Sequence, residues 1–434
     1  MNLWISGIIE DDKVLRELNT QGIKAVERDF RCILCKGSKL LCGKARCPIL
    51  VRLYTQLKLK PILEKTEIEG SCPPDIFIGR VGYPNVYIGP LIPPVKGDTS
   101  ILSCPELWHG KSIDEIVNLR FQLVRGKHRT NVKNFEGKIV ELTREIALSK
   151  TPVESEAQFR KKPSSTLVLD DEVQPFGPSA PLKNLLLGSM KTDQKIEKAY
   201  NDTDLKASEA IFWLYEKGVL VSRIQRAFSA GLFGIEKNRK FVPTRWSITA
   251  VDSIISQKLL EQVKTFPLIN EFRVYEHEAL DNKWIVLMIP DYWSYELIEA
   301  WYPNTVWNPT SEKTVIFSDW EGFEGRNTYP SIGGCWFASR LSISQSLLDE
   351  KRQATVIVLR EVYPGYLFPV GVWNVRENVK AALKNLPLKF DKIEDALKYI
   401  SGRLKIPLIE WIKNSYLLKR ILYQKKLLYF LKSP

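Results

Sequence analysis

The chain has 434 residues, 44% of them hydrophobic, and a formal net charge of +13 at pH 7. This length suits two or three packed units, and the hydrophobic share is large enough to form their cores. The positive charge favours a polyanionic partner, either nucleic acid or an anionic membrane surface. No window approaches the roughly 18 consecutive apolar residues of a membrane-spanning helix, which leaves at most a surface association with membranes.

The N-terminal segment M-N-L-W-I-S-G-I-I-E-D-D-K has a short apolar run that is followed at once by acids. It lacks the cationic start and apolar core of an export signal, so we expect a cytoplasmic protein. Seven cysteines, an odd number, do not indicate a disulfide framework in that reducing compartment. Cys72, Cys104 and Cys335 are isolated along the chain, and we interpret them as small buried hydrophobes.

The other four cysteines fall within sixteen residues and form a C-x2-C-x6-C-x4-C array of Cys32, Cys35, Cys42 and Cys47. A C-x2-C pair directs two sulfurs to one metal, and the nearby Gly37 and Gly43 are free to adopt the positive φ of a tight ligand turn. Four thiolates around Zn²⁺ form a closed tetrahedral site, which is structural because no position remains for substrate. We predict structural zinc, with an iron–sulfur cluster as the main alternative.

Two pairs of β-rich runs predict hairpins. I-F-I-G-R at 76–80 and V-Y-I-G-P at 86–90 flank the loop V-G-Y-P-N, and similar runs at 272–278 and 283–290 flank A-L-D-N. The repeated glycines of the first hairpin indicate either a close approach by another backbone or a phosphate, or a simple bulge.

Helical patterns occupy residues 112–149 and 186–232. Helices and strands mix without a βαβ period, so we predict an α+β fold with mixed sheets and packed helices. The expected regions are a zinc-knuckle region at 1–70, an N-terminal α/β part at 71–185, a C-terminal α+β domain at 186–408 and a helical tail at 409–434.

Four long phrases resemble the archaeal Nre family of DNA-repair proteins. They are F-I-G-R-V-G-Y-P-N-V-Y-I-G-P-L-I-P-P at 77–94, D-D-E-V-Q-P-F-G-P-S-A-P-L at 170–182, G-I-E-K-N-R-K-F-V-P-T-R-W-S-I-T-A-V-D-S at 234–253 and G-R-N-T-Y-P-S-I-G-G-C-W-F-A-S-R-L at 325–341. The resemblance extends from the cysteine array to the final residues. It implies a role in DNA-damage tolerance or repair, an N-terminal zinc finger, and a C-terminal motif that binds the sliding clamp, PCNA.

The tail Q-K-K-L-L-Y-F-L-K-S-P at 424–434 matches the clamp-binding pattern that the resemblance implies, through Gln424, Leu427, Phe430 and Leu431. Leucine stands at the last position, where a second aromatic residue is more usual. In a short 3₁₀ turn the three apolar side chains form one plug, while the glutamine anchors by hydrogen bonds. The alternatives are an amphipathic terminal helix from Ile409 that packs on the body, and a basic helix that lies on a membrane.

A basic phrase, E-K-N-R-K-F-V-P-T-R-W at 236–246, is the first candidate for DNA contact. Lysine and arginine bind phosphates, and a neighbouring indole can stack on an unpaired base. The alternative is a solvated loop before a helix. Arg125, Lys127 and Arg129 form a second candidate patch. The candidate residues of the first phrase are Lys237, Arg239, Lys240, Arg245 and Trp246.

An acidic phrase, S-D-W-E-G-F-E-G-R, offers the main candidate for metal-dependent catalysis, ahead of Asp252, Glu276 and His277. Asp319, Glu321 and Glu324 could bind Mg²⁺ while Arg326 holds a phosphate, although three acids in a glycine-rich loop are commonly a solvated turn. The chain has no G-x-x-x-x-G-K-[ST] phosphate loop, so ATP-driven motor activity finds no support.

These features together predict a nucleoid-associated DNA-repair factor that is recruited to damage through PCNA and binds DNA through basic surfaces. The second hypothesis is a metal-dependent DNA-processing enzyme, of nuclease or nucleotidyl-transfer type, that the same tail recruits. The third is a basic peripheral membrane protein. Whether the protein catalyses a reaction stays open at this point.

Overall fold

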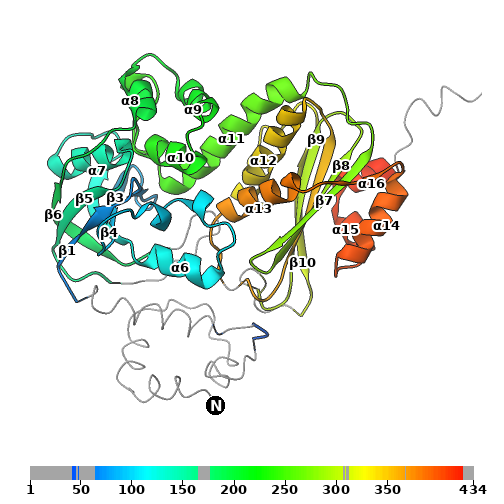
Figure 1. Cartoon of the computed structure of the whole chain (residues 1–434), viewed down its shortest axis with the longest axis horizontal. Coiled ribbons are helices and arrows are strands. Elements are labelled where there is room, and N and C mark those ends of the chain that lie inside the picture. Colours follow the sequence, from blue (N-terminus) through cyan, green and yellow to red (C-terminus); the bar gives the residue numbers. More distant parts are fainter. Residues whose placement is uncertain are drawn as a thin grey trace, which may run out of the picture.

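Two six-stranded sheets with helices packed around them form the described part of the protein (Figure 1). The predicted α+β class is confirmed. None of the described helices is long and apolar enough to cross a bilayer. The computed structural model describes residues 42–44, 47, 64–164, 176–305, 308, 312–366 and 368–423.

The first sheet has the strand order β1-β5-β6-β4-β3-β2, and every neighbouring pair is antiparallel except β4 and β6. In β5, V-E-S-E-A-Q-F alternates strictly between buried and exposed side chains, as a half-buried strand requires. Helix α7 (Lys138–Leu148) packs on the buried face. The strands are β1 (Glu67–Cys72), β2 (Ile76–Ile78), β3 (Asn85–Ile92), β4 (Val124–Asn131), β5 (Val153–Phe159) and β6 (Ser179–Leu187).

The predicted first hairpin is confirmed, because β2 and β3 pair antiparallel. Gly89 allows β4 to approach closely, since a Cβ at this position would lie 1.9 Å from the carbonyl oxygen of Gly126. Cys72 is fully buried in the same core, and burial raises the pKa of its thiol. Cys104 and Cys335 are only partly buried.

The helical prediction for residues 112–149 is correct for α6 (Ile113–Phe121) and α7, and wrong for the segment between them. Residues Val124–Asn131 form the central strand β4, which lies between β3 and β6. The segment V-R-G-K-H-R-T-N carries few apolar residues. It therefore lacks the alternation of apolar and polar residues that would have indicated a strand. Tertiary pairing with two neighbouring strands determines its conformation.

Helix α11 (Thr244–Val263) joins the two sheets into one body (Figure 1). Val251, Ile255 and Leu259 contribute to the core of the first sheet, whereas Leu260 and Val263 contribute to the core of the second. The predicted helices of residues 186–232 are confirmed, although β6 extends to Leu187. They are α8 (Gln194–Asn201), α9 (Ala207–Glu216) and α10 (Val221–Ser229).

The second sheet has the order β10-β9-β11-β8-β7-β12, and only β9 and β11 are parallel. All residues of β8, β9 and β11 are buried, because helices cover both faces. The strands are β7 (Phe272–Ala279), β8 (Asn282–Ile289), β9 (Ser294–Trp301), β10 (Val315–Glu321), β11 (Thr355–Val362) and β12 (Leu388–Phe390).

Two helical layers cover this sheet (Figure 1). Helices α11, α12 (Gly334–Glu350) and α13 (Trp373–Lys384) lie on one face. Helices α14 (Ile393–Arg403), α15 (Leu408–Asn414) and α16 (Tyr416–Tyr423) lie on the other. The predicted second hairpin is confirmed as β7 and β8, with Leu280 and Asp281 both at positive φ in its two-residue turn.

Candidate nucleic-acid interface

The loop between β2 and β3 lies against the start of α11. The backbone N–H of Ile78 donates a hydrogen bond to Thr244 Oγ1 at 3.0 Å. The rings of Tyr83 and Trp246 lie 5.1 Å apart between centroids, tilted by 53°. The fold therefore brings together two of the phrases that the sequence analysis singled out, although about 160 residues separate them along the chain.

A third segment joins this contact through Val132, which follows β4. Val132 donates its N–H to the carbonyl of Pro84 at 2.9 Å and accepts the N–H of Phe241 at 2.8 Å. Val132 therefore links the hairpin loop to the segment that contains Lys240, whose side chain is exposed. The predicted basic phrase and the hairpin are thus joined by the Tyr83–Trp246 contact and by the backbone bonds through Val132.

Large apolar side chains are exposed at this contact. Val81 at the hairpin tip is 85% exposed, Tyr83 41% and Trp246 45%. The hairpin loop G-R-V-G-Y-P-N contains exposed Arg80 and no acid, and the first turn of α11 also lacks acids. Exposed rings beside cations suit a partner that offers both phosphates and flat apolar faces.

Strand β4 extends this surface across the first sheet. Arg129 is exposed and pairs across the strands with Tyr87, which is 45% exposed. Lys127 is half-buried on the same face, and its burial, together with Arg125 and Lys161, lowers its pKa. We call Arg80, Tyr83, Tyr87, Arg129, Lys240 and Trp246 the hairpin surface.

Two arginines of the predicted patches have structural partners instead. Arg125 is buried, and its guanidinium lies 4.9 Å from the ring centroid of Phe77 and 4.4 Å from that of Phe176. Burial and the nearby Arg120 lower the pKa of Arg125 to about 10. These contacts fix the first sheet against the segment at Phe176.

Arg239 holds the loop before α11. Its guanidinium donates to the backbone carbonyls of Gly234 at 2.7 Å, Tyr200 at 2.8 Å and Asp202 at 2.8 Å. Three such bonds leave little capacity for a phosphate, so its role in the fold is to position the loop. Lys237, two residues earlier, is exposed.

Sequence reasoning did not select Arg80, Tyr83 or Tyr87. We interpreted the hairpin through its glycines alone, and the exposure of its aromatic rings depends on which face of the sheet the helices cover. The available signal was an aromatic residue placed between glycine and proline in a turn, where no core can form.

Asp319 of the acidic phrase pairs with Arg326. Asp319 Oδ1 lies 2.7 Å from Arg326 Nη1, and its Oδ2 accepts the N–H of Ser331 at 2.6 Å. Burial opposes ionisation, but these bonds hold the pKa of Asp319 below its usual value. Arg326 also lies 5.0 Å from the ring of Trp336.

Glu321 is buried and pairs with a different arginine. Its Oε2 accepts from Arg340 Nη1 at 3.0 Å, and its Oε1 accepts from Trp293 Nε1 at 3.2 Å. Burial raises the pKa of Glu321 although Arg340 opposes this. Glu324 is exposed on the following turn. Within the described ranges, no three histidine, cysteine or acidic side chains gather in a way that could hold a metal.

Only part of the cysteine array can be placed. Cys42 and Cys47 are half-buried, and Gly43 between them has φ +70°, the positive value expected of a ligand turn. Gly43 contacts Asn304, whose Nδ2 would lie 2.9 Å from a Cβ at this position. Cys32 and Cys35 lie outside the described residues, so the zinc site stays a prediction.

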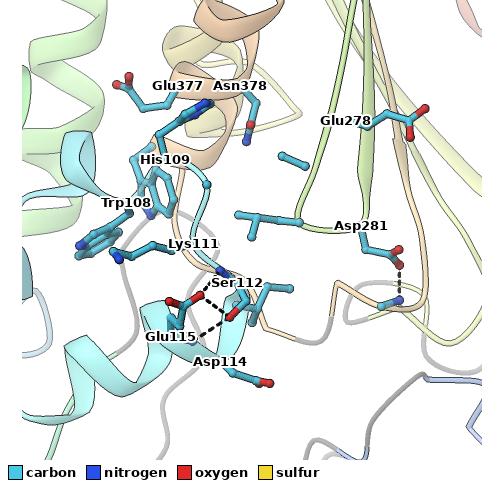
Figure 2. A pocket seen from close by; sticks show the side chains of 16 residues that line it. Trp108, His109, Lys111, Ser112, Asp114, Glu115, Glu278, Asp281, Glu377 and Asn378 are labelled. Carbon is cyan, nitrogen blue, oxygen red and sulfur yellow. Dashed lines mark hydrogen bonds between the residues drawn. The ribbon is translucent and has the colours of Figure 1, made fainter.

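A groove of about 560 Å³ lies between α6, the turn of β7 and β8, and α13 (Figure 2). His109 projects toward Glu377 and Asn378 at its inner wall. Its charged lining consists of one lysine and five acids, which makes it unsuitable for a phosphate. These residues are Lys111, Asp114, Glu115, Glu278, Asp281 and Glu377.

Two acids of this groove stabilise the fold. Glu115 accepts from the N–H and hydroxyl of Ser112 at 2.8 Å each, which caps α6 (Figure 2). Asp281 accepts the N–H of Gly365. The groove therefore has the geometry of a junction between the two units, and the nucleic-acid candidate remains the hairpin surface.

The C-terminal helices form an anchored stem. The helix that we expected from Ile409 is broken at Ser415 into α15 and α16, and Trp411 and Leu417 are buried in the core of the second sheet. Tyr423, the last described residue, is 69% exposed. Gln424, Leu427, Phe430 and Leu431 lie outside the described residues, so the clamp motif stays a prediction.

The fold and this surface define a two-sheet α+β protein with an exposed cationic and aromatic loop. Two family profiles match the sequence: "Archaeal Nre, N-terminal" over residues 41–308 and "Archaeal Nre, C-terminal" over residues 321–430. The chain belongs to the archaeal Nre family.

Three curated relatives cover nearly the whole chain. DNA repair protein NreB of Archaeoglobus fulgidus is 41% identical over 390 residues, which is 90% of this chain and 97% of the relative. DNA repair protein NreA of the same organism is 38% identical, covering 86% and 94%. DNA repair protein NreA of Haloferax volcanii is 34% identical, covering 90% and 95%. No solved structure matches the chain.

Proposed function

We propose that this protein is a DNA-repair factor that binds DNA through the hairpin surface and is recruited through PCNA by residues 424–434. The relatives carry the name DNA repair protein, and the family spans both described units. The factor acts in the cytoplasm, at the nucleoid. Its net charge of +13 favours association with a polyanion.

The observation that carries the DNA-binding part is the convergence of three distant segments at one exposed surface. The bond Ile78–Thr244 holds the hairpin at α11, and the bonds of Val132 to Pro84 and Phe241 link it to the segment that contains Lys240. Arginine and lysine side chains there contact phosphates, while the rings supply apolar faces. Phosphate contacts provide affinity, and they position the rings relative to the bases.

The anchored stem supports the clamp-binding part of the proposal. Residues 424–434 follow an exposed residue at the end of a helix whose other face is buried. A tail that begins at the surface can reach a partner while the body stays on DNA. Tethering to a ring on DNA raises the local concentration of the hairpin surface, which compensates for weak direct binding.

Structural zinc is part of the proposal. Four thiolates at Cys32, Cys35, Cys42 and Cys47 match the donor set and number that Zn²⁺ requires in a closed site. The positive φ of Gly43 supports a turn that brings Cys42 and Cys47 toward one centre. We propose no catalysis by the acids of β10, because Asp319 and Glu321 are each engaged by an arginine.

Fluorescence anisotropy of the full chain with labelled duplex DNA tests the DNA-binding part. The Arg80→Ala/Arg129→Ala/Lys240→Ala variant removes three exposed cations of the hairpin surface. We expect about tenfold to hundredfold weaker binding and a shallower dependence on salt, because phosphate contacts release counterions. The matched control is Lys384→Ala/Lys392→Ala/Lys398→Ala, which removes three exposed cations at the end of α13, at the N-cap of α14 and within α14. Equal losses in both variants would reject the hairpin surface.

A further inference from the structure

We propose that the hairpin surface recognises an unpaired base, so that the preferred ligand is DNA with a bulged or single-stranded base rather than intact duplex. This inference rests on the proposed DNA binding and adds the form of DNA to it. The observation that supports it is that the rings of Tyr83, Tyr87 and Trp246 are half-exposed close to exposed cations of the hairpin surface.

The rings are held by an ordered backbone. Gly79 N–H donates to the carbonyl of Tyr87 at 2.7 Å, and Asn85 N–H donates to that of Gly82 at 2.9 Å. Asn131 Nδ2 donates to Asn85 Oδ1 at 3.1 Å, which fixes the hairpin to β4. Because the loop is bonded at both ends, the rings need little ordering when they bind.

Intact duplex gives these rings no suitable partner. Its base faces are stacked on one another, and only phosphates, sugars and base edges are accessible. An unpaired base exposes a flat π face, which an aromatic side chain covers without sequence preference. Half-exposed rings beside Arg80 and Arg129 therefore match a ligand that has both phosphates and free base faces.

Val81 adds an apolar wedge at the tip of the same loop. It is 85% exposed, and Arg80 and Gly82 flank it. Apolar side chains at such positions insert between base steps, and insertion is cheapest where stacking is already broken. An anionic membrane is the other surface that apolar tips with cations can enter. The loop offers one aliphatic residue and three aromatic rings, two of which are in contact, and this composition favours bases over a lipid layer.

The test measures affinity of the full chain for three labelled DNAs of one sequence: intact duplex, duplex with a one-base bulge, and single strand. We expect the wild type to bind the bulged and single-stranded forms about tenfold more tightly than the duplex. Trp246→Ala and Tyr83→Ala should lose this preference, because affinity for the bulged and single-stranded forms should fall more than affinity for the duplex. Trp246→Phe should retain it, because phenylalanine preserves a π face.

Fluorescence of a base analogue reports stacking in the same complexes. With 2-aminopurine at the bulge, we expect the wild type and Trp246→Phe to quench its emission and Trp246→Ala to leave it unchanged. Thermal unfolding of each variant confirms that it is folded. Equal affinity of the wild type for all three DNAs, or equal weakening of all three by Trp246→Ala, would overturn the inference. Failure to bind any DNA, or binding only to vesicles of anionic lipid, would instead reject the proposed function.

Discussion

Glu296 on β9 caps the N-terminus of α16, where it accepts the backbone N–H of Tyr416 at 2.8 Å. The same carboxylate accepts the N–H of Leu417 at 2.9 Å and the hydroxyl of Ser415 at 2.6 Å. It is fully buried, and burial raises its pKa. Tyr416 also stacks on Trp320 at 3.7 Å between ring centroids. The position from which the tail departs is thus fixed by the second sheet.

Replacement of Glu296 should detach this stem. Glu296→Ala leaves buried N–H groups without an acceptor, so we expect the free energy of unfolding to fall by about 2–4 kcal/mol. Ser415→Ala removes one partner of Glu296 and the acceptor of the Leu418 N–H, so it should cost about 1–2 kcal/mol. Urea denaturation followed by circular dichroism measures both. A loss below 1 kcal/mol for Glu296→Ala would show that the cap does not stabilise the stem.

The ion pair between Glu321 and Arg340 should act in stability, not in chemistry. Both side chains are buried, and removal of one partner leaves an uncompensated charge. We expect Glu321→Ala to lower the free energy of unfolding by about 3–5 kcal/mol. Urea denaturation measures this loss.

Incubation of the wild-type protein with labelled DNA and Mg²⁺ tests the enzyme hypothesis. DNA cleavage that Asp319→Ala/Glu321→Ala abolishes in still-folded protein would favour the enzyme hypothesis instead.

Gly89 should tolerate no side chain. A Cβ there would lie 1.9 Å from the oxygen of Gly126, so β3 and β4 would have to separate. We expect Gly89→Ala to cost more than about 3 kcal/mol of unfolding free energy. Gly402 in α14 is the control, because nothing lies within 4 Å of a Cβ at that position. Gly402→Ala should be neutral or stabilising by up to about 1 kcal/mol. Equal effects of both changes would contradict the close packing of the two strands.

The stacked histidines between the two units should make stability depend on pH. His109 and His277 lie 6.0 Å apart between ring centroids. Burial and the neighbouring His109 lower the pKa of His277, although Asn378 and Glu278 favour its protonation. The folded state therefore binds fewer protons than the unfolded state in the range below the usual histidine pKa. By linkage, the stabilisation is present above that pKa and is lost as pH falls through the lowered value.

Urea unfolding between pH 5 and pH 7.5 measures this dependence. We expect the wild type to lose more stability on acidification than His277→Gln, whose side chain does not titrate in this range. Parallel pH profiles for the two proteins would show that His277 is not responsible.

Strong local patterns predicted much of the fold. The two hairpins and the helices of residues 186–232 have clear periods and turn residues, and the structure confirms each. Strand β4 was not predictable, since its charged residues hide the period and its partners are distant in sequence. The break at Ser415 depends on Glu296, which lies more than a hundred residues earlier.

The candidate site was also predictable from the sequence only in part. Trp246 and Lys240 were selected because the sequence places several cations close to an indole, and both side chains are exposed. Arg239 belonged to the same phrase, but three carbonyl partners that only the fold assembles occupy it. Tyr83 was missed because its exposure follows from how the hairpin meets α11.

Photo-crosslinking of the full chain to DNA that carries 5-iodouracil at a bulged position tests the central claim most directly. Mass spectrometry of the crosslinked peptides should place the adduct on residues 79–87 or on the segment that contains Trp246. Adducts confined to the second sheet and its helices, with none in these two segments, would contradict binding of DNA at the hairpin surface.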